Sequence, residues 1–167
     1  MNDKYSMLRH FLAALAYRIQ KALRGSPDGF GDFSAGNRTR TPSELIRHIT
    51  SVLGYSRTFF VGGCYRPEPL PTLEQEVSRF HDMLRDLASH IENGTELLDG
   101  MTPESLLQGP FADAMTHVGQ LAMLRRLRGW PVPPENFIVA KIDPSQLGPD
   151  QPDPVSPDKE WPESSTN

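Results

Sequence analysis

The feature that most constrains this fold is a set of four segments in which apolar residues recur at steps of three and four. This spacing places apolar side chains on one side of an α-helix, as in helices that bury a single stripe. In the first segment the apolar positions are Leu8, Leu12, Leu15, Ala16, Ile19 and Leu23. The four segments span about residues 3–24, 42–61, 73–93 and 111–128. Four amphipathic helices joined by turns predict an all-α fold, a four-helix bundle.

Residues typical of helix starts separate these segments. Thr41 precedes Pro42 and lies three residues before Glu44, a pattern that indicates a capping box. Thr72 and Gln75 form a second pair with the same spacing before the third helix. Both patterns predict helices that begin immediately after the threonine.

The connecting segments are less regular. Residues 101–109 predict a short helical turn before the last helix, and residues 136–142, "NFIVAKI", are the best candidate for a strand or an extended lid. The loop 26–40 is long for a compact domain, and loops of this kind often line a site. Its two phenylalanines, Phe30 and Phe33, are expected to pin it to the bundle.

Composition divides the chain into two parts. It holds 16 prolines and only 37% hydrophobic residues, which indicates a compact part joined to an irregular one. Residues 1–146 carry the helical stripes and are expected to form the bundle. Residues 147–167 are Pro-rich and almost free of aliphatic side chains, so they bury too little apolar surface to offset the entropy of ordering. We predict a disordered tail whose one large apolar residue, Trp161, stays undocked and whose removal leaves the melting temperature nearly unchanged.

Charge and cysteine content exclude several classes of protein. The net charge of −4 argues against a nucleic-acid partner, because nucleic-acid binders gather a basic excess on one face. The one local basic cluster, Arg125, Arg126 and Arg128, is expected to be a solvated last helical turn. A single cysteine, Cys64, excludes an internal disulfide framework and fits a reducing compartment. The chain has no apolar run long enough for a membrane span and no signal-peptide pattern, so a cytoplasmic protein is expected.

Three polar residues lie on or beside the expected buried stripes, where bundle proteins build their sites. His48 follows Leu45 by three residues in the second helix, and Asp113 and His117 are four residues apart in the last helix. Residues four apart have Cβ atoms about 5–6 Å apart on one side of a helix. Imidazole and carboxylate groups bind Zn, Ni, Fe or Mn ions, and three protein ligands leave a position open for water or substrate. His48, Asp113 and His117 are therefore a candidate site for a divalent transition metal, with Gln120 placed to hydrogen bond to a ligand.

Each of these residues also has an explanation without a metal. His48 fits a hydrogen-bonded core histidine, and His117 fits a bond to a backbone carbonyl. Asp113 falls in the first turn of its expected helix, where a carboxylate interacts favourably with the helix dipole. The di-metal pattern Glu-x-x-His is absent from the chain. Spacing alone leaves both a metal centre and a structural hydrogen-bonded cluster open.

The remaining histidines and the cysteine are weaker candidates. His81 flanks the stripe of the third helix and is the best spare ligand. His10 lies off its stripe, and His90 is near a helix end, where a cation suits the dipole. Cys64 lies in a loop without a paired base near it in sequence, so it is not expected to be a nucleophile.

Two segments resemble a known family. "TPSELIRHITSVLGYS" is similar to the second helix, and "FADAMTHVGQLAMLRRLRGWPVP" to the last helix, of the DinB-like (YfiT-like) metalloenzyme superfamily. The resemblance spans most of residues 5–142 and implies a four-helix bundle, commonly homodimeric, with a metal held between these two helices by a histidine triad. It implies His48 as the first ligand and His117 as the third. Asp113 stands where the family has its middle histidine, an exchange that preserves ligation.

The resemblance also implies an activity. Characterised members include enzymes that use a low-molecular-weight thiol such as bacillithiol or mycothiol, as transferases or as an isomerase. The first expectation is therefore a thiol-dependent S-transferase with a small-molecule substrate, in which the metal lowers the pKa of the thiol. The second is a hydrolase that uses a water in the open position. The third is a non-catalytic dimeric bundle that has lost the metal and binds a partner or small ligand.

Overall fold

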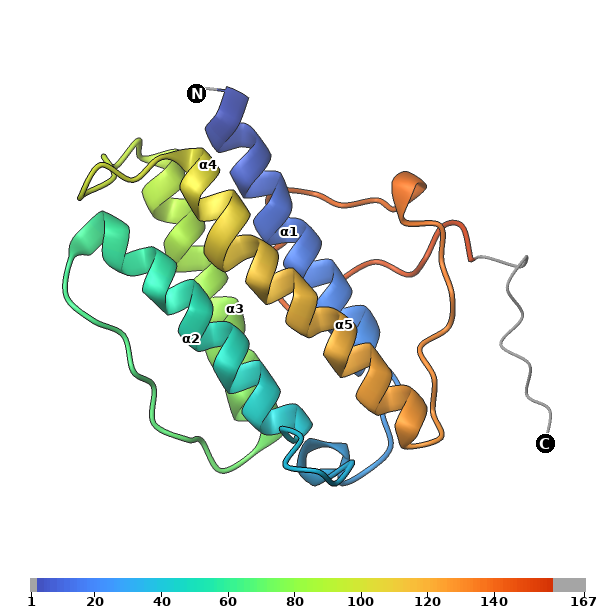
Figure 1. The fold of residues 1–167 in the computed structure, drawn as a ribbon. Helices are drawn as coiled ribbons and strands as arrows, with labels where there is room; N and C mark the ends of the chain where they lie inside the picture. The colour runs from blue at the N-terminus through green and yellow to red at the C-terminus, as the bar shows by residue number, and fades with distance from the viewer. Residues whose placement is uncertain (1–2, 158–167) are drawn as a thin grey trace.

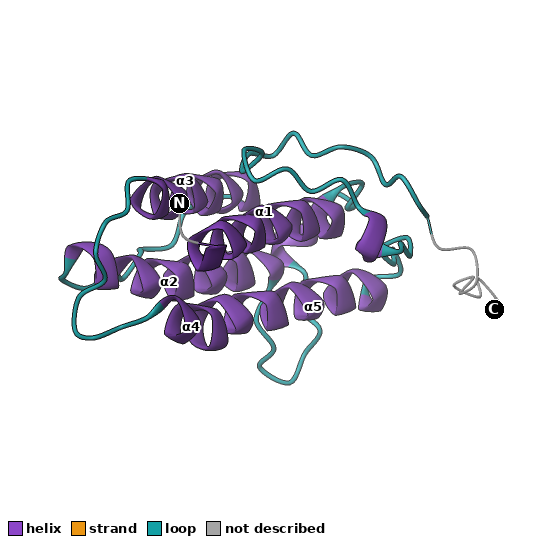
Figure 2. Cartoon of the chain, turned by 90° about the horizontal axis from the view of Figure 1, so that it is seen from above, coloured by secondary structure: helices purple, strands orange, loops and turns teal. Residues whose placement is uncertain are grey.

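Four long helices form the body of this computed structural model, which describes residues 3–157. They are α1 (Asp3–Leu23), α2 (Pro42–Val61), α3 (Leu73–Glu92) and α5 (Ala112–Leu127). α1 and α2 each pack against α3 and α5, so the four helices surround one core (Figure 1), as the view from above also shows (Figure 2). The all-α class is confirmed, and residues 3–157 contain no strand. None of the helices in this range is long and apolar enough to cross a lipid bilayer.

The helix starts follow the capping patterns of the sequence. The Thr41 side chain accepts the Glu44 N–H at 3.3 Å, and the Glu44 carboxylate accepts the Thr41 N–H at 2.9 Å. At α3 the Thr72 hydroxyl accepts the Gln75 N–H at 3.3 Å, the first of the two bonds of the expected box. The periodic apolar residues then enter the core, as Leu12 of α1 does with no exposed surface.

The sequence suggested that the last helix begins at residue 111, but the helical structure begins earlier. A short helix, α4 (Pro103–Leu106), runs into a π-helical turn (Leu107–Phe111) that continues directly into α5. Pro110 lies inside this turn and has no N–H to donate, which favours a local departure from α geometry. The expected short turn and the expected last helix are therefore one continuous helical rod.

Phe30 and Phe33 anchor the 26–40 loop, as predicted. Phe30 lies in a 3-10 turn (Phe30–Asp32) and is buried in the core, and Phe33 packs against that core while partly exposed. The end of the loop, which includes Arg38 and Arg40, lies near the N-terminal half of α2 and borders the candidate site described below.

Residues 136–142 form neither a strand nor an extended lid. Phe137–Val139 make one 3-10 turn. The Phe137 ring packs edge-on against Tyr17, with 6.3 Å between ring centroids, and the Arg18 guanidinium carbon lies 3.6 Å from the Phe137 ring centroid. The apolar residues of this segment do not pair in a sheet. The largest of them, Phe137, packs against α1.

Arg125 is buried, in contrast to the solvated position expected for it. Its guanidinium donates to the backbone carbonyls of Ala22, Arg24 and Trp130 at 2.8, 2.9 and 2.8 Å. A longer contact of 3.4 Å reaches the Gly25 carbonyl. The side chain therefore satisfies carbonyl groups at the end of α1 and ties them to the end of α5, whereas its neighbours in the cluster, Arg126 and Arg128, are exposed.

The described part of the expected tail contacts the bundle. Leu147 is 7% exposed, and its carbonyl accepts a hydrogen bond from His81 Nδ1 at 2.7 Å. The expectation of a disordered tail over 147–167 did not foresee these contacts. That expectation was based on the number of aliphatic side chains. It did not include the Leu147 backbone carbonyl, which provides a hydrogen-bond partner for the buried His81 imidazole.

A charged contact holds the same segment further along. Arg24 Nη1 donates to Asp153 Oδ1 at 2.7 Å, and its Nη2 donates to the Gln151 carbonyl at 2.6 Å. Trp161, which was expected to stay undocked, lies outside the described residues.

Leu147→Ala is expected to lower the free energy of unfolding by about 2 kcal/mol, because truncating a buried leucine removes apolar contacts and leaves a cavity. Urea denaturation followed by circular dichroism measures the change. Val155→Ala is the matched control in the same segment, since Val155 is 46% exposed and its truncation is expected to cost less than about 0.5 kcal/mol. Equal and small effects of the two substitutions would show that the segment is not docked in solution.

Candidate metal centre

The three candidate ligands converge at the contact between α2 and α5. His48 comes from α2, and Asp113 and His117 come from α5. One ligand atom from each residue lies within 4.8 Å of the other two. Two ligands of one ion lie no more than about 4.2 Å apart, which is twice a metal–ligand bond of roughly 2.1 Å. Small side-chain rotations therefore suffice to bring all three atoms onto a common ion.

The site is closed toward the core and open toward solvent. His117 Nε2 lies 3.3 Å from Asp113 Oδ1, and the centroids of the His48 and His117 rings are 4.5 Å apart in an edge-to-face arrangement. His117 is buried, whereas half of the Asp113 side chain is exposed. A ligand or substrate can therefore approach from the Asp113 side without crossing the bundle.

Gln120 occupies the position expected of a residue that orients a ligand. Its Oε1 atom lies 3.0 Å from His117 Nδ1. An amide oxygen only accepts, so this contact places the ring proton on Nδ1 and leaves a lone pair on Nε2. Nε2 is the atom that faces Asp113, and in this tautomer it is a free metal ligand.

The environment of His48 favours the form of imidazole that binds metals. Burial lowers the pKa of His48 below its ordinary value, and the positive charge of Arg40 lowers it further. The Asp113 carboxylate opposes this shift in pKa. His48 is therefore neutral at pH 7, with a ring nitrogen available for coordination.

The continuous helix removes the simplest alternative role for Asp113. A carboxylate in the first turn of a helix is stabilised by free N–H groups. Here the helix already runs from Pro103, and the Ala112 N–H bonds within it to the Gly109 and Leu107 carbonyls. Asp113 therefore does not cap a helix end, and its position beside two imidazoles needs another explanation.

Comparison with known proteins gives no further evidence on the role of these three residues. No family model, no curated protein and no solved structure matches this chain. The case for a metal therefore depends on the donor atoms themselves.

The other histidines do not join the group. His81, the spare ligand of the sequence analysis, bonds through Nε2 to the Gln20 side chain at 2.8 Å and through Nδ1 to a backbone carbonyl. His90 stacks on Phe60 with 5.4 Å between centroids, and His10 is exposed on α1. The three residues expected from sequence are thus the ones that the fold brings together.

Cys64 is exposed in the connector after α2 and is not a member of the metal group. That it is not a nucleophile stays a prediction. The chemistry of the site therefore involves imidazole and carboxylate groups and no thiol of the chain.

Sequence reasoning missed four arginines beside His48. Arg38, Arg40, Arg47 and Arg66 line a depression that also includes His48. Three of them lie within the ten residues that precede His48, and this density was the available signal. The fourth comes from the connector between α2 and α3, which only the fold brings close.

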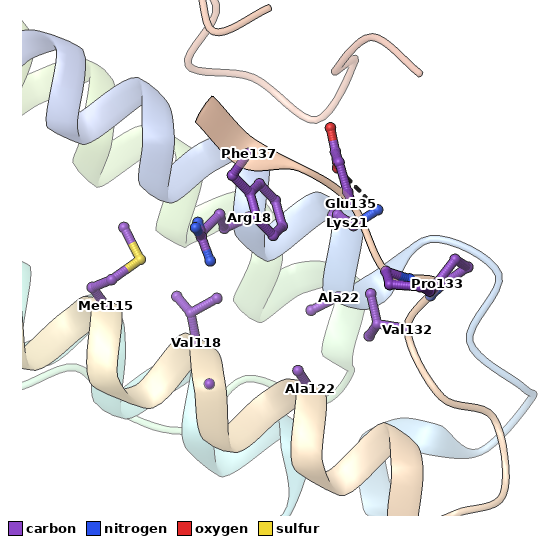
Figure 3. A pocket seen from close by; sticks show the side chains of 12 residues that line it. Arg18, Lys21, Ala22, Met115, Val118, Ala122, Val132, Pro133, Glu135 and Phe137 are labelled. Atoms are coloured by element: carbon purple, nitrogen blue, oxygen red, sulfur yellow. Dashed lines mark ion pairs between the residues drawn. The ribbon is translucent and has the colours of Figure 1, made fainter. Parts of the chain in front are cut away.

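A separate apolar depression lies on the other side of α5, between α1 and α5 and under residues 132–137 (Figure 3). Glu135 is buried at its rim, where it pairs with Lys21 at 3.0 Å and accepts a hydrogen bond from the Tyr17 hydroxyl at 2.5 Å. Burial and the Glu135 carboxylate raise the pKa of Tyr17. These groups partner one another and fasten the 132–137 segment to α1, so we assign this depression a structural role.

Gln120→Leu is expected to weaken metal binding by about 10–100-fold, the usual cost of losing the outer hydrogen-bond partner of a ligating histidine. Competition with a chromophoric chelator measures the dissociation constant. Gln108→Leu is the matched control, since Gln108 is exposed beside the site and contacts no candidate ligand. Unchanged affinity in the Gln120 variant would contradict the assigned tautomer of His117.

Proposed function

We propose that this chain is a metal-dependent enzyme of the DinB-like bundle type, in which His48, Asp113 and His117 hold one divalent transition metal. The observation that carries the proposal is the contact between His117 Nε2 and Asp113 Oδ1. With the ring proton on the Gln120 side, these are two acceptors facing each other at 3.3 Å. A cation between them satisfies both.

The donor set fits such an ion. Two imidazoles and one carboxylate suit Zn, Ni, Fe or Mn, and three protein ligands are the number found in centres that keep an open position. The half-exposed side of Asp113 provides the route by which a small molecule reaches that position. The resemblance of the α2 and α5 segments to the DinB-like family supports the same assignment, and the homodimer that it implies stays a prediction.

A bound divalent metal would supply a positive charge that lowers the pKa of a coordinated thiol or water. Since Cys64 is not part of the site, the nucleophile has to enter with a second molecule. We assign this role to a low-molecular-weight thiol and propose an S-transferase that joins it to an electrophilic small molecule. The chain's contribution is to hold the imidazoles at fixed tautomers and to leave one face of the site open.

The test begins with metal analysis of protein purified without chelators and without a histidine tag. About one equivalent of a single transition metal per chain is expected. Turnover is then measured with a chromogenic electrophile in the presence and absence of bacillithiol, mycothiol or cysteine. Metal-dependent turnover that needs a thiol supports the S-transferase, and turnover with water alone supports the hydrolase instead.

A third outcome would contradict both enzymes. Metal at trace levels, together with unchanged stability and solution behaviour after Asp113→Asn, would show a structural hydrogen-bonded cluster in a non-catalytic bundle. Asp113→Asn is informative because it removes the charge and keeps a side-chain oxygen at the same position.

A further inference from the structure

An arginine-rich depression adjoins the candidate metal centre. It has a volume of about 460 Å³, and His48 forms part of its wall. Three chain segments build it: the loop before α2, α2 itself, and the connector 62–72, which runs back along α2 toward the start of α3 (Figure 1). The arginines that line it are Arg38, Arg40, Arg47 and Arg66.

Most of this positive charge is not neutralised by carboxylates of the described residues, 3–157. Arg47 Nη1 lies 3.6 Å from the buried Glu76 carboxylate and is therefore partnered. Arg38, Arg40 and Arg66 have no carboxylate partner within residues 3–157. The chain has a net charge of −4, so three unpaired guanidinium groups around one depression are a local excess of positive charge. Ion pairing within the described residues does not account for it.

One acidic residue also lines the hollow. The Glu44 carboxylate accepts the Thr41 N–H at 2.9 Å as part of the helix cap, so its charge is directed at the helix start. It leaves a positive balance in the depression, since it offsets at most one of the three unpaired arginines.

The backbone holds two of these arginines in defined places. Arg38 adopts a left-handed conformation with φ of 58°, inside a turn in which the Thr39 N–H donates to the Gly36 carbonyl at 2.9 Å. Arg66 follows Tyr65, whose ring lies against Gly54 of α2. A Cβ built on Gly54 would fall 2.0 Å from that ring, so only glycine allows the connector to approach α2 this closely.

We propose that the substrate or thiol cosubstrate of this enzyme carries an anionic group, a carboxylate or a phosphate, which binds to Arg38, Arg40 and Arg66. Guanidinium groups match the planar, bidentate geometry of both anions. The reacting atom then lies at the His48–Asp113–His117 site. A second depression, lined by Tyr55, Pro110 and Asp113 and sharing Ser51 with the first, provides space for the rest of the molecule. This inference rests on the proposed function of the same site.

The test measures anion binding directly, so that it does not depend on turnover. Full-length protein, with and without added zinc, is titrated with succinate, inorganic phosphate and succinamide by isothermal calorimetry. We expect binding of succinate or phosphate and none of the neutral succinamide. The anion that binds more tightly identifies the group as a carboxylate or a phosphate.

The variants locate the binding. The double variant Arg40→Gln, Arg66→Gln is expected to weaken anion binding at least about tenfold, since it removes two charge-assisted contacts. Arg85→Gln is the matched control, because it removes one charge on α3 at an exposed pair with Asp82. Arg66→Lys is a milder variant that keeps the charge, and it is expected to weaken binding less than the double variant does.

Equal binding of succinamide, or equal weakening by Arg85→Gln, would overturn the inference. Tight binding of a single-stranded oligonucleotide with no binding of small anions would overturn it as well. If the double variant fails to fold, the comparison of charged and neutral probes on the wild type still decides. Metal content of the folded variants separates the two proposals: retained metal without anion binding contradicts this inference alone, and anion binding without metal contradicts the proposed function alone.

Discussion

His117→Ala is expected to raise the dissociation constant for the metal by at least about 100-fold, more than the 10–100-fold cost of losing an outer partner of a ligand. The substitution removes the imidazole that stands between Asp113 and His48 in the cluster. Metal analysis after dialysis and chelator competition both report the loss. Circular dichroism should show unchanged helix content, because the site lies at the open edge of the bundle.

His10→Ala is the matched control for this experiment, as His10 is an exposed helical histidine of α1. It should bind metal like the wild type. His48→Ala should lose the metal as His117→Ala does, although the two residues come from different helices. Stoichiometric metal in both histidine variants would place the ion elsewhere in the chain.

Arg125→Met is expected to destabilise the fold by about 3–5 kcal/mol, the largest effect on stability that we predict. Hydrogen bonds to a charged group contribute about 1.5–3 kcal/mol each, and buried acceptors left without a donor cost about 1–3 kcal/mol. The Arg125 guanidinium serves the carbonyls of Ala22, Arg24 and Trp130, so a methionine of similar length leaves three acceptors unsatisfied. Urea denaturation gives the change in unfolding free energy.

Arg126→Met is the control for the Arg125 variant, because it makes the same replacement one residue later at an exposed position. Its expected effect is below about 0.5 kcal/mol. If the two variants are equally stable, Arg125 is solvated, as the sequence first suggested, and the contacts to α1 do not form in solution.

The helices were predictable because local chemistry and tertiary packing agree in them. The Thr41–Glu44 box placed the start of α2 at the correct residue, and the stripe of α1 entered the core at the positions that its spacing indicates. The proximity of Asp113 and His117 was predictable for the same reason. A four-residue spacing fixes the side shared by Asp113 and His117, whatever the rest of the fold does.

The remaining features depend on contacts that no local pattern encodes. Arg125 looks like a surface residue until the end of α1 presents the Ala22 and Arg24 carbonyls to it. Leu147 follows a Pro-rich stretch, and its burial depends on an imidazole 66 residues earlier in the chain. Arg66 enters the depression only because its neighbour packs on a glycine of α2. In each case the decisive partner lies in a distant segment.

The π turn at Leu107–Phe111 sets the rotational phase of everything that follows it. Its bonds span five residues where the α-helix spans four, so removing one residue there would restore ordinary α geometry. The π turn takes up this one extra residue, so α5 would keep nearly the same rotation relative to α4 after the deletion. Asp113 and His117 would still face His48, and the amount of helix would stay nearly constant. A single-residue deletion in this turn is therefore expected to be almost silent in far-ultraviolet spectra and to leave metal binding in place.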